Sequence, residues 1–81
     1  MSDAEITRKM KDALEATIGT VGVEISDATT FEQQLGMDYL DICNYEMTIE
    51  DAFGIQIDEE PSTTFGELKA VVARKLEEAG R

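Results

Sequence analysis

The chain has 81 residues, enough for one small domain, and its hydrophobic content of 42% is too high for a disordered chain. It has no histidine and a single cysteine, Cys43, which excludes an intramolecular disulfide, a Cys/His zinc site and the usual acid–base catalyst near neutral pH. The net charge is −11 and no lysine or arginine occurs between Asp12 and Leu68, so we expect no binding to nucleic acid or anionic lipid.

This acidic stretch favours basic protein surfaces as partners, because opposite charges speed encounter at low salt. The charge alone is equally compatible with acids that only keep a small domain in solution. No apolar run approaches the roughly 18 residues that span a bilayer, and no signal-peptide pattern occurs. We therefore expect a monomer of the cytoplasm or an organelle matrix, without membrane insertion.

The first predicted helix begins near Ser2, because Ser2 and Glu5 have the spacing of a capping box. Gly19 and Gly22 should end it. Its apolar face consists of Ile6, Met10, Ala13, Leu14 and Ile18. Residues 20–37 lack sustained periodicity, which predicts a long ordered loop. The side chains that could attach this loop to the core are Val23, Ile25, Phe31 and Leu35.

The second helix is predicted over residues 38–53. Asp38 suits the N-cap position and Asp41 the third helical position, where both carboxylates favour the positive end of the helix dipole. Gly54 suits the position just past the end of the helix.

At about 100° per residue, the apolar side chains of this helix separate into two stripes on nearly opposite sides. The broader stripe, expected in the core, consists of Ile42, Tyr45, Ile49, Ala52 and Phe53. The narrower stripe consists of Leu40, Cys43 and Met47, and charged or polar residues flank it: Asp41, Asn44 and Asp51 on one side, Glu46 and Glu50 on the other. The narrow stripe is either a docking surface or a second core stripe packed under the long loop.

After Ile55 and Ile57, two apolar anchors, residues 58–61 are predicted to form a turn or a single helical turn. Thr64 and Glu67 have capping-box spacing and open a last helix that should end near Glu78. Its apolar face consists of Phe65, Leu68, Val71, Val72 and Leu76, with Lys69, Arg74 and Lys75 toward its C-terminal end. Together these elements predict one all-α domain over residues 1–81.

Residues 35–41 read Leu-Gly-Met-Asp-Tyr-Leu-Asp and resemble the acyl carrier protein signature, Leu-Gly-x-Asp-Ser-Leu-Asp. Phe31, the stretch at residues 49–57 and the run Thr63-Thr64-Phe65 are also similar to that family, so the resemblance covers most of the chain. It implies a small bundle of three main helices plus a short third helix, with a long loop between the first two. It also implies a non-enzymatic carrier of fatty-acid or polyketide type.

In that family the signature serine carries 4′-phosphopantetheine, and Tyr39 stands in its place. A tyrosine hydroxyl lies several ångströms further from the backbone, and misplacement by about 1 Å can cost about 100-fold in rate. We therefore predict no phosphopantetheine on Tyr39 and no acyl thioester on this chain. The tyrosine ring is expected to lie over Leu40 or Cys43, to block the mouth of the acyl cavity, or to anchor a partner.

Two more positions depart from the family. Asn44 stands where many members have glutamate, and the link between Ile57 and Phe65 is shorter than in typical bacterial members. We therefore expect the short third helix to be vestigial.

The resemblance also implies a docking surface on the second helix for basic patches of acyl-transfer or synthase-type enzymes. Carried over by position, its members are Asp38, Leu40, Asp41, Cys43, Met47, Glu50 and Asp51. Cys43 could in principle hold an acyl group itself, but no neighbouring base or cation would activate it, so we interpret it as a small buried hydrophobic residue.

The favoured hypothesis is an acyl carrier protein-like domain that docks partner enzymes without covalent chemistry, with no catalytic residue, metal site or bound cofactor of its own. One alternative is a true acyl carrier protein whose attachment serine has been replaced. Another is an acidic regulatory module that responds to metal, although the acids lie on a helix and lack the loop pattern of an EF-hand.

Overall fold

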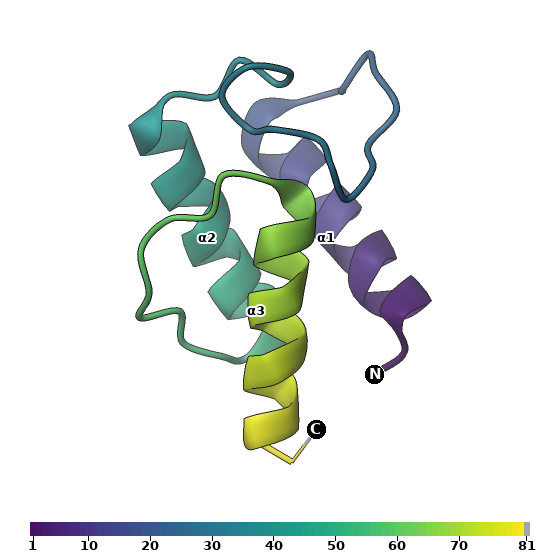
Figure 1. Cartoon of the computed structure of the whole chain (residues 1–81), viewed down its shortest axis with the longest axis vertical. Helices are drawn as coiled ribbons and strands as arrows, with labels where there is room; N and C mark the ends of the chain where they lie inside the picture. The colour runs from purple at the N-terminus through teal and green to yellow at the C-terminus, as the bar shows by residue number, and fades with distance from the viewer. Residues whose placement is uncertain (81) are drawn as a thin grey trace.

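The computed structural model describes residues 1–80, which form three α-helices: α1 (Asp3–Ile18), α2 (Tyr39–Phe53) and α3 (Phe65–Glu78). The loop from α1 to α2 crosses one end of the bundle, and the loop from α2 to α3 runs along its side (Figure 1). Within the described residues there is no strand, only an isolated bridge between Thr30 and Thr64 that joins the two loops. This confirms the predicted all-α class.

The predicted helix starts are confirmed for α1 and α2. The Ser2 hydroxyl accepts a hydrogen bond from the Glu5 N–H at 3.2 Å. The Asp38 carboxylate accepts from the Asp41 N–H at 2.8 Å, and the Asp41 carboxylate accepts from the Asp38 N–H at 3.3 Å. These paired bonds satisfy N–H groups that the first helical turn leaves without partners.

At the other boundaries the structure follows the predictions with one local change. Gly54 ends α2 in the left-handed conformation that glycine adopts without steric cost. Thr64 is the N-cap of α3, but the carboxylate of Glu67 accepts from the N–H and hydroxyl of Thr63 rather than from the N–H of Thr64. The capping interaction thus includes one residue more than the spacing predicts.

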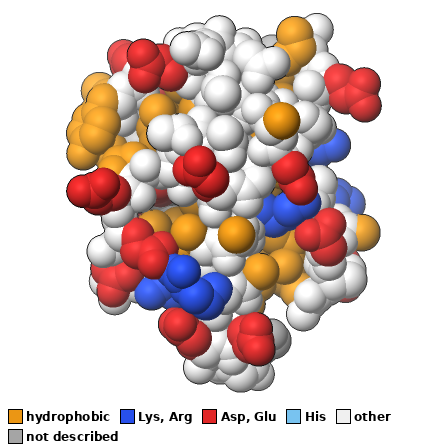
Figure 2. Space-filling view, in the orientation of Figure 1, with side chains coloured by type: hydrophobic (Ala, Val, Ile, Leu, Met, Phe, Trp, Pro, Cys, Tyr) orange, Lys and Arg blue, Asp and Glu red, His pale blue; other side chains and the backbone are white. Residues whose placement is uncertain are grey.

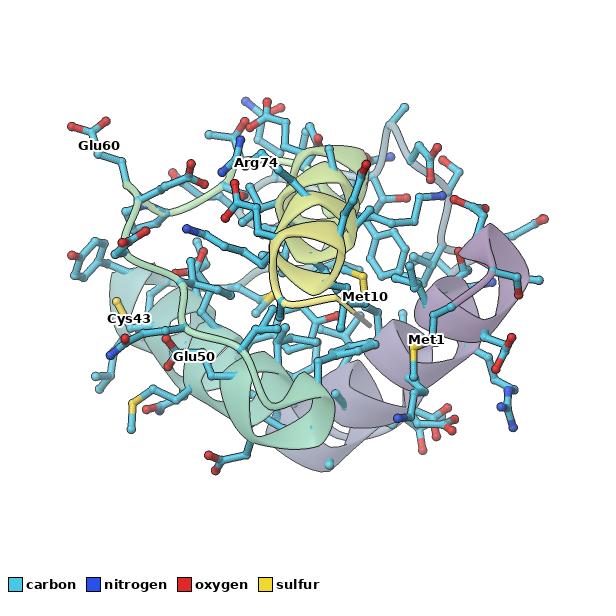
Figure 3. The ribbon with its side chains drawn as sticks, turned by 90° about the horizontal axis from the view of Figure 1, so that it is seen from below. Met1, Met10, Cys43, Glu50, Glu60 and Arg74 are labelled. Carbon is cyan, nitrogen blue, oxygen red and sulfur yellow. The ribbon has the colours of Figure 1, made fainter. Side chains whose placement is uncertain are left out.

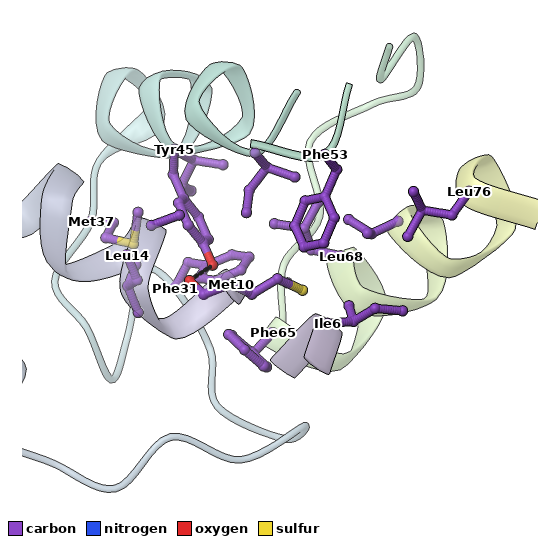
Figure 4. Close-up of a cluster of buried hydrophobic side chains, with 14 residues drawn as sticks. Ile6, Met10, Leu14, Phe31, Met37, Tyr45, Phe53, Phe65, Leu68 and Leu76 are labelled. Carbon is purple, nitrogen blue, oxygen red and sulfur yellow. Dashed lines mark hydrogen bonds between the residues drawn. The ribbon is translucent and has the colours of Figure 1, made fainter. Parts of the chain in front are cut away.

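The core is built from one face of each helix and two residues of the long loop (Figure 4). Its members are Ile6, Met10, Ala13, Leu14, Phe31, Met37, Ile42, Tyr45, Ile49, Phe53, Phe65, Leu68, Val72 and Leu76. At its centre the buried hydroxyl of Tyr45 donates to the carbonyl oxygen of Met10 at 2.7 Å, and its ring packs edge-on against Phe31. This contact fixes which side of α2 faces α1.

Two predicted core contacts are wrong. Val23 is 55% exposed and does not attach the long loop; Phe31 and Met37 do so, because their longer side chains reach the core. Ala52 is exposed, since it lies at the margin of the broad stripe, about 60° from its centre at 100° per residue, and its methyl group is too short to reach inward. Ile25, Leu35 and both isoleucines after α2 pack against the core as partly buried residues.

The short third helix, expected to be vestigial, is absent: residues 55–63, the α2–α3 loop, contain bends but no helical turn. Side chains of the helices hold this loop instead. The carboxylates of Glu50 and Glu46 accept hydrogen bonds from the N–H groups of Ile57 at 2.7 Å and Ser62 at 3.3 Å. On the α3 side, Lys75 pairs with Asp58 at 3.1 Å and Arg74 pairs with Glu59.

The long loop is attached to α3 at Gly66 and Lys69. The Gly66 N–H donates to the carbonyl oxygen of Asp27 at 2.9 Å, and the Lys69 ammonium pairs with the carboxylates of Asp27 at 2.7 Å and Asp3 at 3.3 Å. No helix among residues 1–80 has the length and apolar character that crossing a membrane requires.

Gly66→Ala should destabilise the fold. A Cβ atom at this position would lie 2.8 Å from both the Cβ and the carbonyl oxygen of Asp27, so the loop would have to move. We expect a loss of about 1–3 kcal/mol in the free energy of unfolding, measured by urea denaturation. Gly22→Ala is the control, because its Cβ meets no atom within 4 Å and its stability should be unchanged or slightly raised. Equal urea midpoints for Gly66→Ala and the wild type would contradict this packing.

Candidate docking surface on α2

The side of α2 opposite the core carries exposed apolar residues. Leu40 is 66% exposed and Met47 is 61% exposed, so neither belongs to a second core stripe under the long loop. We call these two residues the outer strip. Both side chains are exposed on the helix face where the sequence predicts a docking surface.

The predicted acidic residues around the outer strip have different surroundings. Asp38 and Asp51 are exposed, whereas Asp41 is half-buried and forms the capping box with Asp38. Glu50 is also half-buried, and its carboxylate is engaged by the backbone of the α2–α3 loop. In Figure 2, acidic side chains surround the hydrophobic ones on the α2 side of the molecule, while basic side chains gather over α3 and toward α1.

Tyr39, the first residue of α2, is 71% exposed. The interaction of its hydroxyl with the side chain of Cys43, one turn further along the helix, is the largest cause that raises the pKa of Tyr39. Burial and the carboxylate of Glu46 add to this increase in the pKa of Tyr39. A raised pKa also leaves less of the nucleophilic phenolate at neutral pH.

Cys43 is a free, half-buried cysteine on the side of α2 that faces the α2–α3 loop (Figure 3). The stripe of Leu40, Cys43 and Met47 is therefore not uniform, since its first and last members are exposed and its middle member is partly covered. Cys43 was interpreted as a small buried hydrophobic residue, and the structure shows it only partly buried.

A surface hollow of about 650 Å³ lies between the start of α2 and the two loops. Tyr39 and Ile42 line it from α2, and residues 60–63 line it from the α2–α3 loop. Thr30, Glu32 and Gln33 complete the lining. The lining combines polar and apolar groups and includes the aromatic ring of Tyr39.

Glu46 helps to hold the α2–α3 loop, a role that the sequence pattern did not predict. Burial raises the pKa of Glu46 above its ordinary value of 4.5, and the carboxylate of Glu50 adds to this, while the hydrogen bond from Ser62 opposes it. The sequence placed both glutamates on the charged flank of the narrow stripe. Their spacing of one helical turn, followed by a loop that returns after Gly54, is the signal that could have revealed their shared contact with that loop.

Within residues 1–80 no group of three or more Asp, Glu, Cys or His side chains is arranged to hold a metal ion. The acids of α2 either cap their own helix, bind the loop backbone or point into water. The exposed carboxylates among them contribute a negative electrostatic potential over α2.

Comparison with curated proteins finds similarity to acyl carrier proteins. Those of Chlorobium phaeovibrioides and Chlorobium luteolum are each 29% identical to this chain over 72 residues, which cover 89% of this chain and 92% of theirs. The acyl carrier protein of Thermotoga maritima is 27% identical over 78 residues, covering 93% of this chain and 96% of its own. No protein family model matches the chain.

Glu46→Gln should stabilise the protein at pH 7 but not at about pH 4. Because the pKa of Glu46 is higher in the folded state than its ordinary 4.5, stability falls as pH rises from 4.5 through the raised value. Glutamine removes the buried charge and its side-chain oxygen can still accept from Ser62. We expect a gain below about 1 kcal/mol, since solvent screens a half-exposed carboxylate.

The matched control is Asp51→Asn, which removes one charge from an exposed position of the same helix. Thermal unfolding of both variants at the two pH values separates the effect of burying the Glu46 carboxylate from the effect of removing one negative charge. If Glu46→Gln were no more stable than Asp51→Asn at pH 7, the half-buried carboxylate would not have the energetic effect described.

Proposed function

We propose that this chain, which is similar to acyl carrier proteins over most of its length, is an acyl carrier protein-like domain that docks partner enzymes through α2 and carries no acyl thioester itself. The similarity over most of the chain and the three-helix bundle support a carrier-type protein rather than an enzyme. The proposal adds two points to this similarity: docking through α2, and the absence of 4′-phosphopantetheine at Tyr39.

The exposure of the outer strip beside uncompensated acids is the observation that carries the docking proposal. Leu40 and Met47 project from α2 next to Asp38 and Asp51, all of them exposed. An apolar centre with a charged rim suits a partner that presents an apolar depression between lysine and arginine side chains. Acyl-transfer and synthase-type enzymes, implied by the family resemblance, are the class of partner we propose.

The position of the Tyr39 hydroxyl supports the absence of 4′-phosphopantetheine. A serine hydroxyl at the first position of α2 would lie on Cβ, close to the N–H groups of the first turn, where a phosphodiester is favoured. The tyrosine hydroxyl instead lies at the far end of an exposed ring, away from Cβ. The chain's own residues therefore do not fit the attachment chemistry, and no covalent step is assigned to them.

The alternative, a true carrier whose serine has been replaced, is favoured by the intact helix start. The paired Asp38–Asp41 capping bonds and the exposed face of α2 are present in spite of Tyr39. If the replacement is the single lost feature, one substitution should restore attachment.

Tyr39→Ser should be modified when the protein is incubated with coenzyme A and a broad-specificity phosphopantetheinyl transferase, while the wild type should not. Intact mass spectrometry measures the added group directly. Tyr39→Ala is the matched control, because it removes the ring as serine does but supplies no hydroxyl. Modification of the wild type would overturn the proposal that Tyr39 prevents attachment; an unmodified Tyr39→Ser protein would overturn the carrier-like docking surface.

A further inference from the structure

Docking and attachment would involve different residues of α2. The residues suited to docking, Leu40 and Met47, are exposed on the side of α2 away from the core, and Tyr39 at the start of the helix is 71% exposed. Tyr39 and residues 60–63 line the same hollow, which places the ring beside the α2–α3 loop. An enzyme that approaches the outer strip therefore meets a clear surface, but it finds no hydroxyl where a serine would offer one.

The charge on this surface is not neutralised by the chain's own basic residues. Among residues 1–80 the ion pairs of Lys69, Arg74 and Lys75 all involve acids outside α2: Asp3, Asp27, Asp58, Glu59 and Glu78. Lys9 lies over the ring of Phe53, at the opposite end of α2 from Tyr39. The acids near the outer strip thus remain available to cations of a partner.

We propose that this chain is an unreactive competitor of acyl carrier proteins: it occupies the carrier-binding surface of enzymes that modify or load a serine-bearing carrier, and so slows them. The inference rests on the proposed function and adds a regulatory consequence to it. The occupant of the α2 surface is an enzyme with an apolar depression ringed by lysine and arginine. Binding without reaction removes that enzyme from its carrier substrate by mass action.

Competition of this kind has a defined kinetic form. The chain binds enzyme that holds no carrier, with or without coenzyme A, at the place where the carrier substrate binds. The apparent KM for the carrier therefore rises linearly with chain concentration while kcat stays constant. At a chain concentration equal to its dissociation constant, the apparent KM doubles. Because the attraction is between exposed charges, inhibition should weaken as salt is raised from about 0.05 M to 0.5 M.

The test uses the transferase named above, coenzyme A and the acyl carrier protein of Thermotoga maritima as substrate, with increasing amounts of the intact wild-type chain. Initial rates of carrier modification give KM and kcat. A rise in KM at constant kcat, reduced at high salt, is the expected result. No change in KM, or a fall in kcat alone, would overturn the proposal.

Two variants locate the inhibition on the outer strip. Leu40→Asp and Met47→Asp should each reduce the inhibitory potency at least about tenfold, because a carboxylate replaces an exposed apolar contact at the centre of the surface. Ala70→Asp is the control: it makes the same kind of change at an exposed position of α3. Circular dichroism verifies that each variant is folded. Equal potency of all three variants would contradict docking through α2.

Failure of the competition proposal and failure of the proposed function give different combinations of results. If Tyr39→Ser is modified but the wild type does not raise KM, the α2 surface is that of a carrier and the tyrosine ring itself prevents docking, which overturns competition alone. If Tyr39→Ser is not modified and the wild type does not inhibit, both proposals are wrong.

Discussion

The buried hydrogen bond from the Tyr45 hydroxyl to the carbonyl oxygen of Met10 is the contact on which the arrangement of α2 depends. A hydroxyl inside an apolar core must have a partner, so α2 cannot rotate without leaving this group unsatisfied at a cost of about 1–3 kcal/mol. The edge-on contact with Phe31 restrains the same ring from the long loop. With Tyr45 directed inward, Leu40 and Met47 are necessarily directed outward.

The rotation of α2 fixed in this way divides its surface into three parts. One faces the core, one carries Glu46 and Glu50 against the backbone of residues 55–63, and one presents the outer strip to water. The sequence pattern assigns Glu46 and Glu50 to a charged rim, but in the structure their carboxylates bind the backbone of the α2–α3 loop. These two acids are therefore less accessible than the pattern predicts. Tyr39 lies on the border between the loop side and the outer strip, where it changes the chemistry of the first turn without covering Leu40.

Local signals predicted the helices well, and contacts between distant segments were harder to predict. The spacing of Ser2 with Glu5 and the identity of Asp38 and Gly54 specify helix ends within a few residues of sequence. Met37 and Val23 could not be sorted into core and surface, because a loop without periodicity does not reveal the direction of its side chains. The hydrogen bond between Glu46 and Ser62 joins residues 16 positions apart, so the one-turn spacing of the two glutamates indicates it only when the return of the loop after Gly54 is also considered.

The most direct test of this division of α2 is backbone amide NMR of the wild-type chain titrated with the phosphopantetheinyl transferase. The account predicts that the largest shift changes occur in the N-terminal half and outer face of α2, at Tyr39, Leu40 and Met47, while Ile57 and Ser62, whose N–H groups are held by Glu50 and Glu46, change little. Changes centred on α1 or α3, or an absence of changes on α2, would contradict it.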